Sequence, residues 1–178
     1  MYYHKIEKTS VANGTGIRVV LWVSGCSLHC KGCQNPQAWS KDSGKPFDDD
    51  AKKELFEALD KSYIQGITFS GGHPLEEYNL TDVHSLVKEI RADFPDKDIW
   101  LYTGLTFDNI LRLITNNTDV IDEKLPELLE IIKLCDVIVD GMYVETLKDI
   151  RLKWRGSSNQ RVIDVQKSIA EGRIILYE

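Results

Sequence analysis

Hydrophobic positions in this chain form short continuous runs that alternate with segments of helical periodicity. Runs rich in branched and aromatic residues predict strands at 17–23, 66–70, 98–102, 136–140 and 173–177. The segments between the runs predict helices within 48–62, 80–95, 106–114 and 125–134. The second of these helices is expected to begin at a cap at Thr81 or Asp82. Apolar strands without alternation are typical of a sheet that is covered on both faces.

This alternation predicts an α/β fold with a mostly parallel sheet built from βαβ units. A closed eightfold barrel needs about 250 residues, and the chain has 178. We therefore expect an open or partial (βα) barrel. No repeat, linker or low-complexity tract interrupts the sequence, which predicts a single domain over residues 1–178.

The charge balance narrows the classes of partner. The chain has 22 basic and 28 acidic residues, and its net charge of −6 argues against nucleic acid as the main partner, although a local basic patch remains open. No apolar run resembles a signal peptide or a membrane span, so we expect a cytoplasmic protein without a membrane partner. In a reducing compartment, cysteines are more often metal ligands or catalytic groups than disulfide partners.

Three of the four cysteines lie in one loop after the first predicted strand, with the spacing Cys26-x3-Cys30-x2-Cys33. The carboxyl end of a parallel strand is where such sheets bind ligands. Iron–sulfur clusters commonly take four thiolates, so three would leave one iron open to another ligand. A closed zinc site would need His29 or Cys135 as its fourth ligand. The spacing indicates a metal site and favours a cluster, with zinc as the alternative; Cys135, which begins an apolar strand, is expected to be a small buried hydrophobe.

Two further motifs offer candidate sites, one after the second predicted strand and one nearer the C-terminus. In "TFSGGHPL", the glycines Gly71 and Gly72 would let a ligand approach the backbone closely, or would simply form a tight turn. His73 beside them is a ligand, a base or an exposed turn residue. The donor-rich stretch "WRGSSNQRVIDV", residues 154–165, is either a solvated loop or a surface that grips a partner's polar groups.

Together these motifs resemble the radical S-adenosylmethionine (SAM) superfamily, whose hallmark is the Cys-x3-Cys-x2-Cys loop. More narrowly, the chain resembles the family of activating proteins of anaerobic ribonucleoside-triphosphate reductases. The resemblance rests on "NGTGIR", "VSGCSLHCKGCQNP", "SGKPF", "FSGGHPL", "DIWLYTG", "DVIVDG" and "WRGSSNQRVID". It implies a radical SAM type of fold, and a [4Fe–4S] cluster on Cys26, Cys30 and Cys33 whose fourth iron is chelated by SAM.

The resemblance also implies an activity. An electron from the reduced cluster, supplied by a flavodoxin-type donor, cleaves SAM and releases methionine and a 5′-deoxyadenosyl radical. This radical abstracts a hydrogen atom from a backbone glycine of the reductase catalytic subunit. Two other interpretations remain: an activase of another glycyl radical enzyme such as pyruvate formate-lyase, and a zinc-binding module without catalytic activity.

The family's SAM contacts are carried over onto residues that flank the cysteine loop and the later strands. They are Gly32, Cys33, Gln34, Gly71, Gly72, His73, Thr103 and Asp140. Three positions depart from the superfamily pattern. Gly32 and Gln34, just before and just after the third cysteine, stand where relatives often have an aromatic residue, and His73 stands where the glycine turn usually continues with an acid. A neutral imidazole accepts a hydrogen bond from the SAM ammonium, whereas a protonated one repels it. We therefore expect SAM binding to weaken as the pH falls through the titration of His73.

Overall fold

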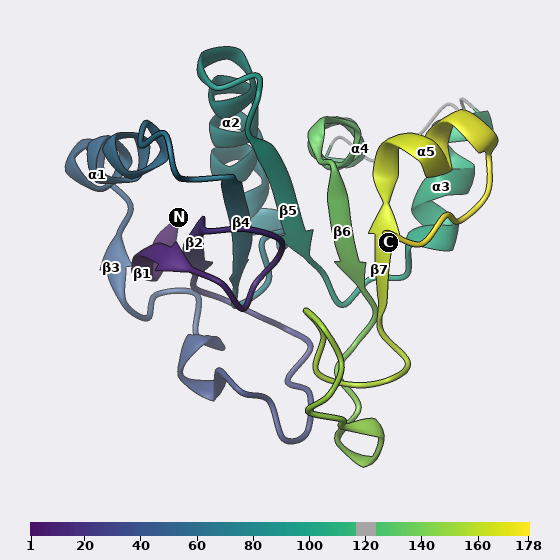
Figure 1. Ribbon diagram of the computed structural model, residues 1–178. Helices are drawn as coiled ribbons and strands as arrows, with labels where there is room; N and C mark the ends of the chain where they lie inside the picture. The colour runs from purple at the N-terminus through teal and green to yellow at the C-terminus, as the bar shows by residue number, and fades with distance from the viewer. Residues whose placement is uncertain (117–123) are drawn as a thin grey trace.

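The computed structural model describes residues 1–116 and 124–178, and its centre is one seven-stranded sheet (Figure 1). The strands are β1 (Tyr2–Ser10), β2 (Arg18–Val23), β3 (Lys45–Pro46), β4 (Gly66–Gly71), β5 (Asp98–Tyr102), β6 (Val137–Asp140) and β7 (Arg161–Asp164). Their order is β3-β1-β2-β4-β5-β6-β7. The central strands β2, β4, β5 and β6 run parallel, whereas β1, β3 and β7 are antiparallel to their neighbours. Within the described residues the sheet has two edges and does not close, so the α/β class and the open sheet are confirmed.

Helices connect the parallel strands and follow the last strand. They are α1 (Asp49–Leu59), α2 (Glu77–Asp93), α3 (Phe107–Asn116), α4 (Leu125–Leu134) and α5 (Val165–Glu171), with short 3-10 helices η1 (Pro36–Ala38) and η2 (Glu145–Leu147). Asp48 caps α1 by accepting a hydrogen bond from the Ala51 amide at 3.0 Å. None of the helices in the described part of the chain is long and apolar enough to cross a bilayer.

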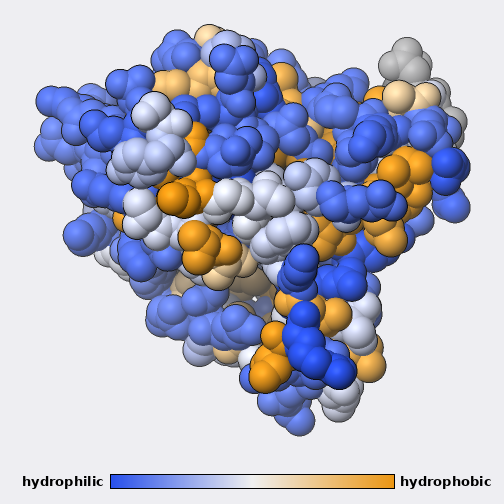
Figure 2. All heavy atoms as spheres, viewed as in Figure 1, coloured by the Kyte–Doolittle hydropathy of each residue, from blue (hydrophilic) through white to orange (hydrophobic). Residues whose placement is uncertain are grey.

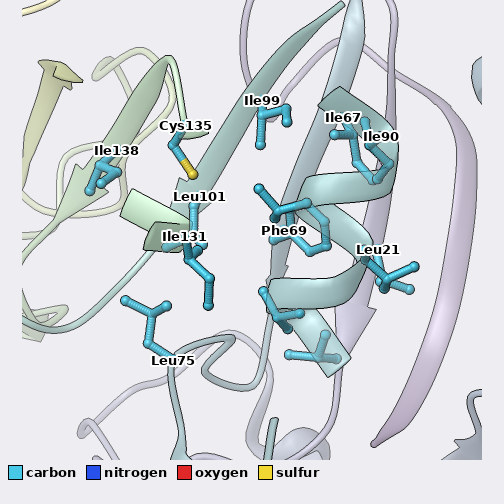
Figure 3. Close-up of a cluster of buried hydrophobic side chains, with 14 of the residues drawn as sticks. Leu21, Ile67, Phe69, Leu75, Ile90, Ile99, Leu101, Ile131, Cys135 and Ile138 are labelled. Atoms are coloured by element: carbon cyan, nitrogen blue, oxygen red, sulfur yellow. The ribbon is translucent and has the colours of Figure 1, made fainter. Parts of the chain in front are cut away.

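The helices cover one face of the sheet and bury the main core there (Figure 3). Strand side chains alternate between the two faces of a sheet, so residues that are paired across neighbouring strands point to the same face and form a row. Leu21, Phe69, Leu101 and Ile138 form such a row, and all four are fully buried. Cys135 lies in the same cluster at 0% exposure, which confirms the prediction of a small buried hydrophobe.

The opposite face is covered by loops and the C-terminal segment instead of helices. Trp100 of β5 packs edge-on against Trp154, with ring centroids 5.2 Å apart, and against Tyr177 at 5.1 Å. Such edge-to-face pairs fill space with favourable aromatic geometry. Both faces are therefore covered, as the continuous apolar runs predicted, but the second covering has no helical periodicity and could not be read from the pattern.

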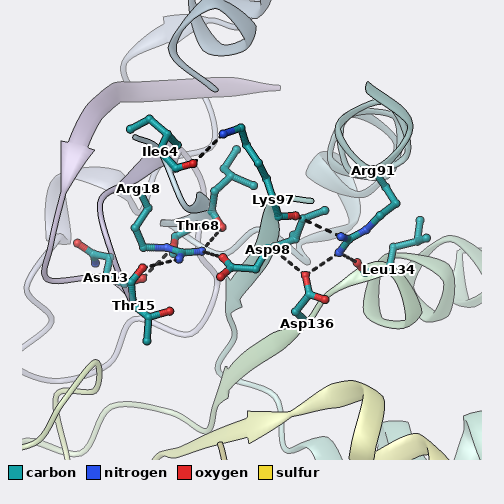
Figure 4. Close-up of polar contacts among 12 residues, drawn as sticks. Asn13, Thr15, Arg18, Ile64, Thr68, Arg91, Lys97, Asp98, Leu134 and Asp136 are labelled. Carbon is teal, nitrogen blue, oxygen red and sulfur yellow. Dashed lines mark hydrogen bonds and ion pairs between the residues drawn. The ribbon is translucent and has the colours of Figure 1, made fainter. Parts of the chain in front are cut away.

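Arg18, the first residue of β2, lies within this second covering and is fully buried (Figure 4). Its guanidinium donates to Thr68 Oγ1 at 2.8 Å, to the Thr15 carbonyl at 2.9 Å and to Asp98 Oδ1 at 2.5 Å. It also lies 5.0 Å from the centroid of the Trp100 ring. Burial raises the pKa of Asp98, although the adjacent guanidinium opposes this. The "NGTGIR" segment is thus held against the core by a buried cation with four hydrogen bonds to protein oxygen atoms.

The sequence pattern missed four strands and helices and misplaced two elements. Strands β1, β3 and β7 and helix α5 were not predicted, because charged residues break up the apolar pattern of β1 and the other three elements are short. The strand expected at 173–177 is wrong. In the structure Leu176 makes an isolated bridge to Ile163, since α5 intervenes and β7 has only four residues.

Helix α2 begins at Glu77 and not at the expected cap at Thr81 or Asp82. Its first turn is held by a tertiary contact that no local pattern contains. The buried amide of Asn79 donates to the Ser24 carbonyl at 2.9 Å, which joins the helix to the end of β2. A long-range hydrogen bond therefore extends the helix beyond its local cap signal.

Candidate functional site

A cavity of about 200 Å³ lies at the carboxyl ends of the parallel strands. Figure 2 shows the surface hollowed between the body of the molecule and the loops below it. The segments that follow β2, β4, β5 and β6 all contribute to the wall, as the rule for parallel sheets predicts. Of the candidates taken from the sequence, the wall contains Cys26, Cys30, Cys33, Gln34, Gly71, Gly72, His73 and Thr103. Gly32 and Asp140 lie outside this lining.

The cysteine loop is anchored where it leaves β2. The Gly25 amide donates to the Ala38 carbonyl at 2.7 Å, and the Cys26 amide donates to the Trp39 carbonyl at 3.0 Å. These bonds attach the loop to η1 and to the residue after it. A loop that must hold a metal group benefits from such fixed ends, because less conformational entropy is lost on binding.

The second half of the loop is a tight turn around Gly32. The Cys33 amide donates to the Cys30 carbonyl at 3.1 Å, and Gly32 has a φ of 73°, which favours glycine. A β carbon at position 32 would lie 2.7 Å from Glu145 Oε1, so glycine also lets the η2 segment approach. The Asn35 amide points to Cys33 Sγ at 3.4 Å. Hydrogen bonds from backbone amides to sulfur stabilise thiolate ligands and tune the reduction potentials of clusters.

The thiols lie close enough to influence one another electrostatically. Burial raises the pKa of Cys26, and Cys30 contributes in the same direction. Burial, with contributions from Glu76 and Cys26, raises the pKa of Tyr78 to about 12.

In the described part of the chain no group of three or more His, Cys, Asp and Glu side chains is already arranged around one point. Three thiols on one wall nevertheless form the soft donor set that iron–sulfur clusters and zinc prefer, so the residues fit such a group.

The two proposed fourth ligands for zinc lie elsewhere. Cys135 is in the helix-covered core, before the amino end of β6, and burial strongly raises its pKa. His29 stacks on Trp39 with ring centroids 4.6 Å apart. Neither residue is among those that line the cavity. The arrangement therefore favours a site with three protein thiols.

The glycine turn is built against the cysteine loop. The Gly72 amide donates to the Val23 carbonyl and the His73 amide to the Gly25 carbonyl, both at 2.7 Å. A β carbon at position 72 would lie 2.4 Å from the Gly25 oxygen, and Gly71 has a φ of 108°. Glycine at position 72 is therefore required for the turn to approach the cysteine loop, and glycine at position 71 lets it pack on the end of β2. The segment forms the tight turn that was one of the two predictions for this motif, and close approach of a ligand to its backbone stays a prediction.

His73 is on the cavity wall, but its imidazole is occupied within the protein. The side chain is 5% exposed, with Nε2 2.8 Å from Thr103 Oγ1 and Nδ1 3.4 Å from Glu76 Oε1. The Glu76 carboxylate accepts hydrogen bonds from the Ser27 amide and hydroxyl, both at 2.7 Å. Burial lowers the pKa of His73, although Glu76 opposes this. The imidazole is thus neutral near pH 7 and both of its nitrogens have partners, which differs from the expected free acceptor.

The Asp140 side chain is buried and is hydrogen-bonded to other parts of the protein. Its buried carboxylate accepts hydrogen bonds from Arg161 and from the Phe107 amide, the latter at 2.9 Å. Asp140 thereby joins β6 to the start of α3 and to β7. The next residue, Gly141, lines the cavity. Asp140 therefore supports the wall from outside, whereas Thr103 is part of it.

The polar stretch at 154–160 forms part of the wall and is not a solvated loop. Gln160 is 8% exposed, and its Oε1 accepts from the Gly156 amide at 3.0 Å and from the Ser157 amide at 3.2 Å. Its Nε2 donates to the Gly141 carbonyl at 3.0 Å. The chain is thus folded around one glutamine, which fixes the side of the cavity that lies beyond β6.

Several lining residues were not selected from the sequence. They are Asn13, Trp22, Leu28, Asn35, Trp39, Ser70, Tyr102, Gly104, Gly141, Met142, Tyr143, Gly156 and Gln160. Trp22, Ser70 and Tyr102 could have been found from strand alternation, because each lies near the carboxyl end of its strand on the face away from the helix-side core. Asn13 could not, since it reaches the cavity through a loop from the other end of β2.

Comparison with known proteins first defines the class. A family model described as "4Fe-4S single cluster domain" matches residues 12–163, a span that contains the three cysteines and every other candidate site residue. The match agrees with three thiols on one cavity wall at the carboxyl edge of the sheet. The chain is therefore an iron–sulfur domain by family.

Its relatives define the family more closely. The chain is 42% identical over 162 residues to an anaerobic ribonucleoside-triphosphate reductase-activating protein of Enterobacteria phage T4, covering 91% of this chain and 93% of the relative. It is 40% identical over 164 residues to the protein of the same name from Escherichia coli K12, covering 91% and 97%. The Vibrio cholerae protein is 38% identical over 162 residues, covering 90% and 96%. The chain belongs to the family of anaerobic ribonucleoside-triphosphate reductase-activating proteins.

Proposed function

We propose that this protein activates an anaerobic ribonucleoside-triphosphate reductase by a radical SAM mechanism in the cavity described above. One observation carries the proposal: the Cys-x3-Cys-x2-Cys loop and the Gly71–Gly72 turn form one cavity wall. The chain in which they meet is 35–42% identical to such activating proteins. We further propose a cytoplasmic location and a flavodoxin-type electron donor, on the basis of the family resemblance.

In this proposal Cys26, Cys30 and Cys33 hold a [4Fe–4S] cluster, and SAM lies beside them against the glycine turn. When bound, the cluster supplies one electron for cleavage of SAM, and the reaction ends with removal of a hydrogen atom from a backbone glycine of the reductase. The protein's own residues orient and enclose these groups. The Asn35 amide, 3.4 Å from Cys33 Sγ, would stabilise the thiolate form of this ligand.

In this proposal the glycines at 71 and 72 bring the turn close to the end of β2 and to the cysteine loop, because a β carbon at either position would collide with main chain there. SAM lies against the backbone of this turn. His73 has a positioning role in this proposal. It connects Thr103 on one side with Glu76 on the other, and Glu76 in turn holds the Ser27 amide, one residue after Cys26. The ring thus fixes the cysteine loop relative to the end of β5, and we assign the SAM ammonium no direct bond to it.

Gln34 and Thr103 both line the wall, and in this proposal they contact SAM, Thr103 with a hydroxyl that is also bonded to His73 and to the Leu105 amide. Gly32 acts through the shape of the turn, and Asp140 acts through its support of the wall. Tyr102 encloses the cavity from the sheet. Exclusion of water by these residues would protect a reactive intermediate from side reactions.

The experiment that tests the proposal is anaerobic incubation with iron, sulfide, SAM, a reductant and the reductase, followed by paramagnetic detection of a glycyl radical. Wild-type protein is expected to turn brown and to generate the radical on the reductase. A colourless protein with stoichiometric zinc would establish the zinc-binding module instead. A radical formed on pyruvate formate-lyase, and none on the reductase, would establish the other activase.

Substitution of single cysteines sharpens this test. Cys30→Ala is expected to abolish both the cluster absorbance and SAM cleavage, because a cluster held by two thiolates lacks a third protein ligand. Cys135→Ala is the matched control, since this thiol is buried in the core away from the cavity, and it should retain the iron content of the wild type. Deoxyadenosine production by Cys30→Ala would contradict the assignment.

A further inference from the structure

The chain between β6 and β7 forms an ordered projection beside the cavity, which we call the rim lobe (residues 142–158). Its two arms are joined by backbone hydrogen bonds, from the Ser158 amide to the Leu147 carbonyl at 2.9 Å and from the Asp149 amide to the Gly156 carbonyl at 3.3 Å. The Tyr102 hydroxyl donates to the Trp154 carbonyl at 2.6 Å and attaches the lobe to β5. The lobe is therefore held in one conformation by the sheet and by itself.

The rim lobe presents apolar side chains to solvent. Ile150 is 90% exposed, Leu147 43% and Met142 41%. Figure 2 shows orange surface among blue on the projection at the lower right, where Figure 1 places η2 and the loops around it. Ordering a backbone costs conformational entropy, which burial of apolar side chains normally offsets. Apolar side chains that stay exposed to solvent contribute no such stabilisation. An ordered projection with an exposed apolar tip is typical of a surface that is buried by a partner.

The rim lobe also reverses the charge of the rest of the molecule. Residues 142–158 carry four basic and two acidic side chains, whereas the whole chain has 22 and 28. Arg151 is 86% exposed at its side chain, and Lys153 lies over the Trp154 ring. Lys31 of the cysteine loop, 92% exposed, pairs with Glu145 at 3.7 Å, and Arg151 pairs with Asp149 at 2.7 Å, so both acidic side chains of the lobe have a basic partner. A basic region on an acidic protein selects a partner that carries carboxylates.

The position of the lobe relates this surface to the cavity. Met142, Tyr143 and Gly156 line the cavity, whereas Ile150 is outside this lining, in the turn closed by the hydrogen bond from the Leu152 amide to the Asp149 carbonyl. Glu145 is the residue that a β carbon on Gly32 would meet, so η2 lies directly against the cysteine loop. A polypeptide that reaches the cavity on this side must pass along the rim lobe.

We propose that the rim lobe is the docking surface for the reductase segment that carries the target glycine, and that this segment is apolar and flanked by carboxylates. Ile150 and Leu147 would be buried in the partner, and Lys148, Arg151 and Lys153 would face its carboxylates. This proposal rests on the proposed function, because it takes the reductase as the partner. It assigns partner recognition to residues that touch neither the cysteines nor the glycine turn.

The test compares two double variants of the full chain for binding to its cognate reductase under anaerobic conditions. The lobe variant carries Ile150→Asp and Lys148→Glu. Its matched control carries Val11→Asp and Lys53→Glu, in which Val11 is 75% exposed and the Lys53 side chain is also 75% exposed, both on other elements. The lobe variant should bind about tenfold more weakly or worse, while the control binds like the wild type. Rising salt should weaken wild-type binding and change binding of the lobe variant less.

SAM cleavage without the reductase separates this proposal from the proposed function. If the lobe variant cleaves SAM at the wild-type rate but fails to bind the reductase, the docking surface is supported. Wild-type affinity of the lobe variant would overturn the docking surface, even where SAM cleavage is normal. Absence of SAM cleavage in the loaded wild type would refute the proposed function, while the binding comparison would still report on the lobe. A wild-type dimer that the lobe variant abolishes, with reductase affinity unchanged, would show that the lobe binds a second copy and would also overturn the proposal.

Discussion

The helix-free face of the sheet has two ends of opposite character, although the same parallel strands form both. At the amino end, Arg18, Asp98 and the aromatic rings around Trp100 fill the space with bonded and packed side chains. At the carboxyl end, Gly71 and Gly72 let backbone segments pack closely, and three thiols and a buried histidine line a cavity. The first end is filled by large side chains, whereas at the second end glycines let two backbone segments meet beside a cavity.

This difference teaches where stability and ligand binding reside in the fold. Arg18 is a buried cation whose donors are directed at oxygen atoms of the protein, so it stabilises the fold as long as its partners remain. The backbone at the cavity end instead brings the cysteine loop and the glycine turn together with little side-chain packing between them. We expect substitutions at the first end to affect unfolding, and substitutions at the second end to affect cofactor binding as well.

The largest effect on stability is expected from Asp98→Ala, because it leaves the guanidinium of Arg18 buried without its carboxylate. Loss of one partner of a buried pair costs about 3 kcal/mol in the free energy of unfolding. Denaturant unfolding measures the change, and Glu57→Ala, which removes an exposed partner of Lys53, is the control that should leave the midpoint unchanged. Iron content after reconstitution should stay at the wild-type value. A midpoint that is the same in Asp98→Ala and wild type would contradict a structural role for the Arg18 cluster.

A smaller loss of stability, with a separate loss of binding, is expected from Gly72→Ala. The added β carbon would lie 2.4 Å from the Gly25 oxygen, so the turn and the cysteine loop must separate, at a cost of about 2 kcal/mol. SAM affinity of the reconstituted protein should fall in the same variant. Gly172→Ala is the control, because it has a φ of 64° but meets no atom within 4 Å. It should cost about 1 kcal/mol and leave SAM affinity unchanged; normal SAM affinity in Gly72→Ala would show that the two loops need not touch.

The smallest effect is a pH dependence that arises from His73 at the cavity end. Its pKa in the folded protein is lowered by burial, so the unfolded chain takes up this proton first as the pH falls below about 6.5. The native state should lose stability from about pH 6.5 downwards, by at most about 1.4 kcal/mol per pH unit, and gain none above it. Burial alone would raise the pKa of Glu76, but the hydrogen bonds from Ser27 outweigh it and lower this pKa. The contribution of Glu76 to the stability of the fold is therefore lost only at more acidic pH.

Unfolding curves of wild type and His73→Gln between about pH 7.5 and 5.5 isolate this contribution, because the variant lacks the titrating group. The variant should show a flatter dependence of unfolding free energy on pH, whatever its absolute stability. Equal slopes for the two proteins would mean that His73 is not the group responsible. The same buried neutral ring predicts that SAM affinity changes little with pH in the range where we first expected protonation to weaken it.

The sequence was sufficient for the central strands, the helices between them and the cysteine loop. These features have local signals: continuous apolar runs, helical periodicity, and thiols at fixed spacing. β1, β3, β7 and α5 were missed because charged residues or short length hide their patterns. The hydrogen-bond partners of His73 and Asp140 could not be predicted from the local sequence. The Nε2 of His73 is bonded to Thr103, thirty residues later, and Asp140 is bonded to Arg161 of another strand.

The sequence by itself determined the α/β class, the donor set of three thiols and the glycine turn, because each depends on residues that are close along the chain. Only the tertiary structure decided that "WRGSSNQR" folds around Gln160 as a cavity wall, that Arg18 is a bonded core residue, and that His73 has no free nitrogen. Each of these outcomes depends on burial and on hydrogen-bond partners from other segments. Burial can reverse the ordinary behaviour of a polar or titratable side chain, and it is settled only when the strands and loops assemble.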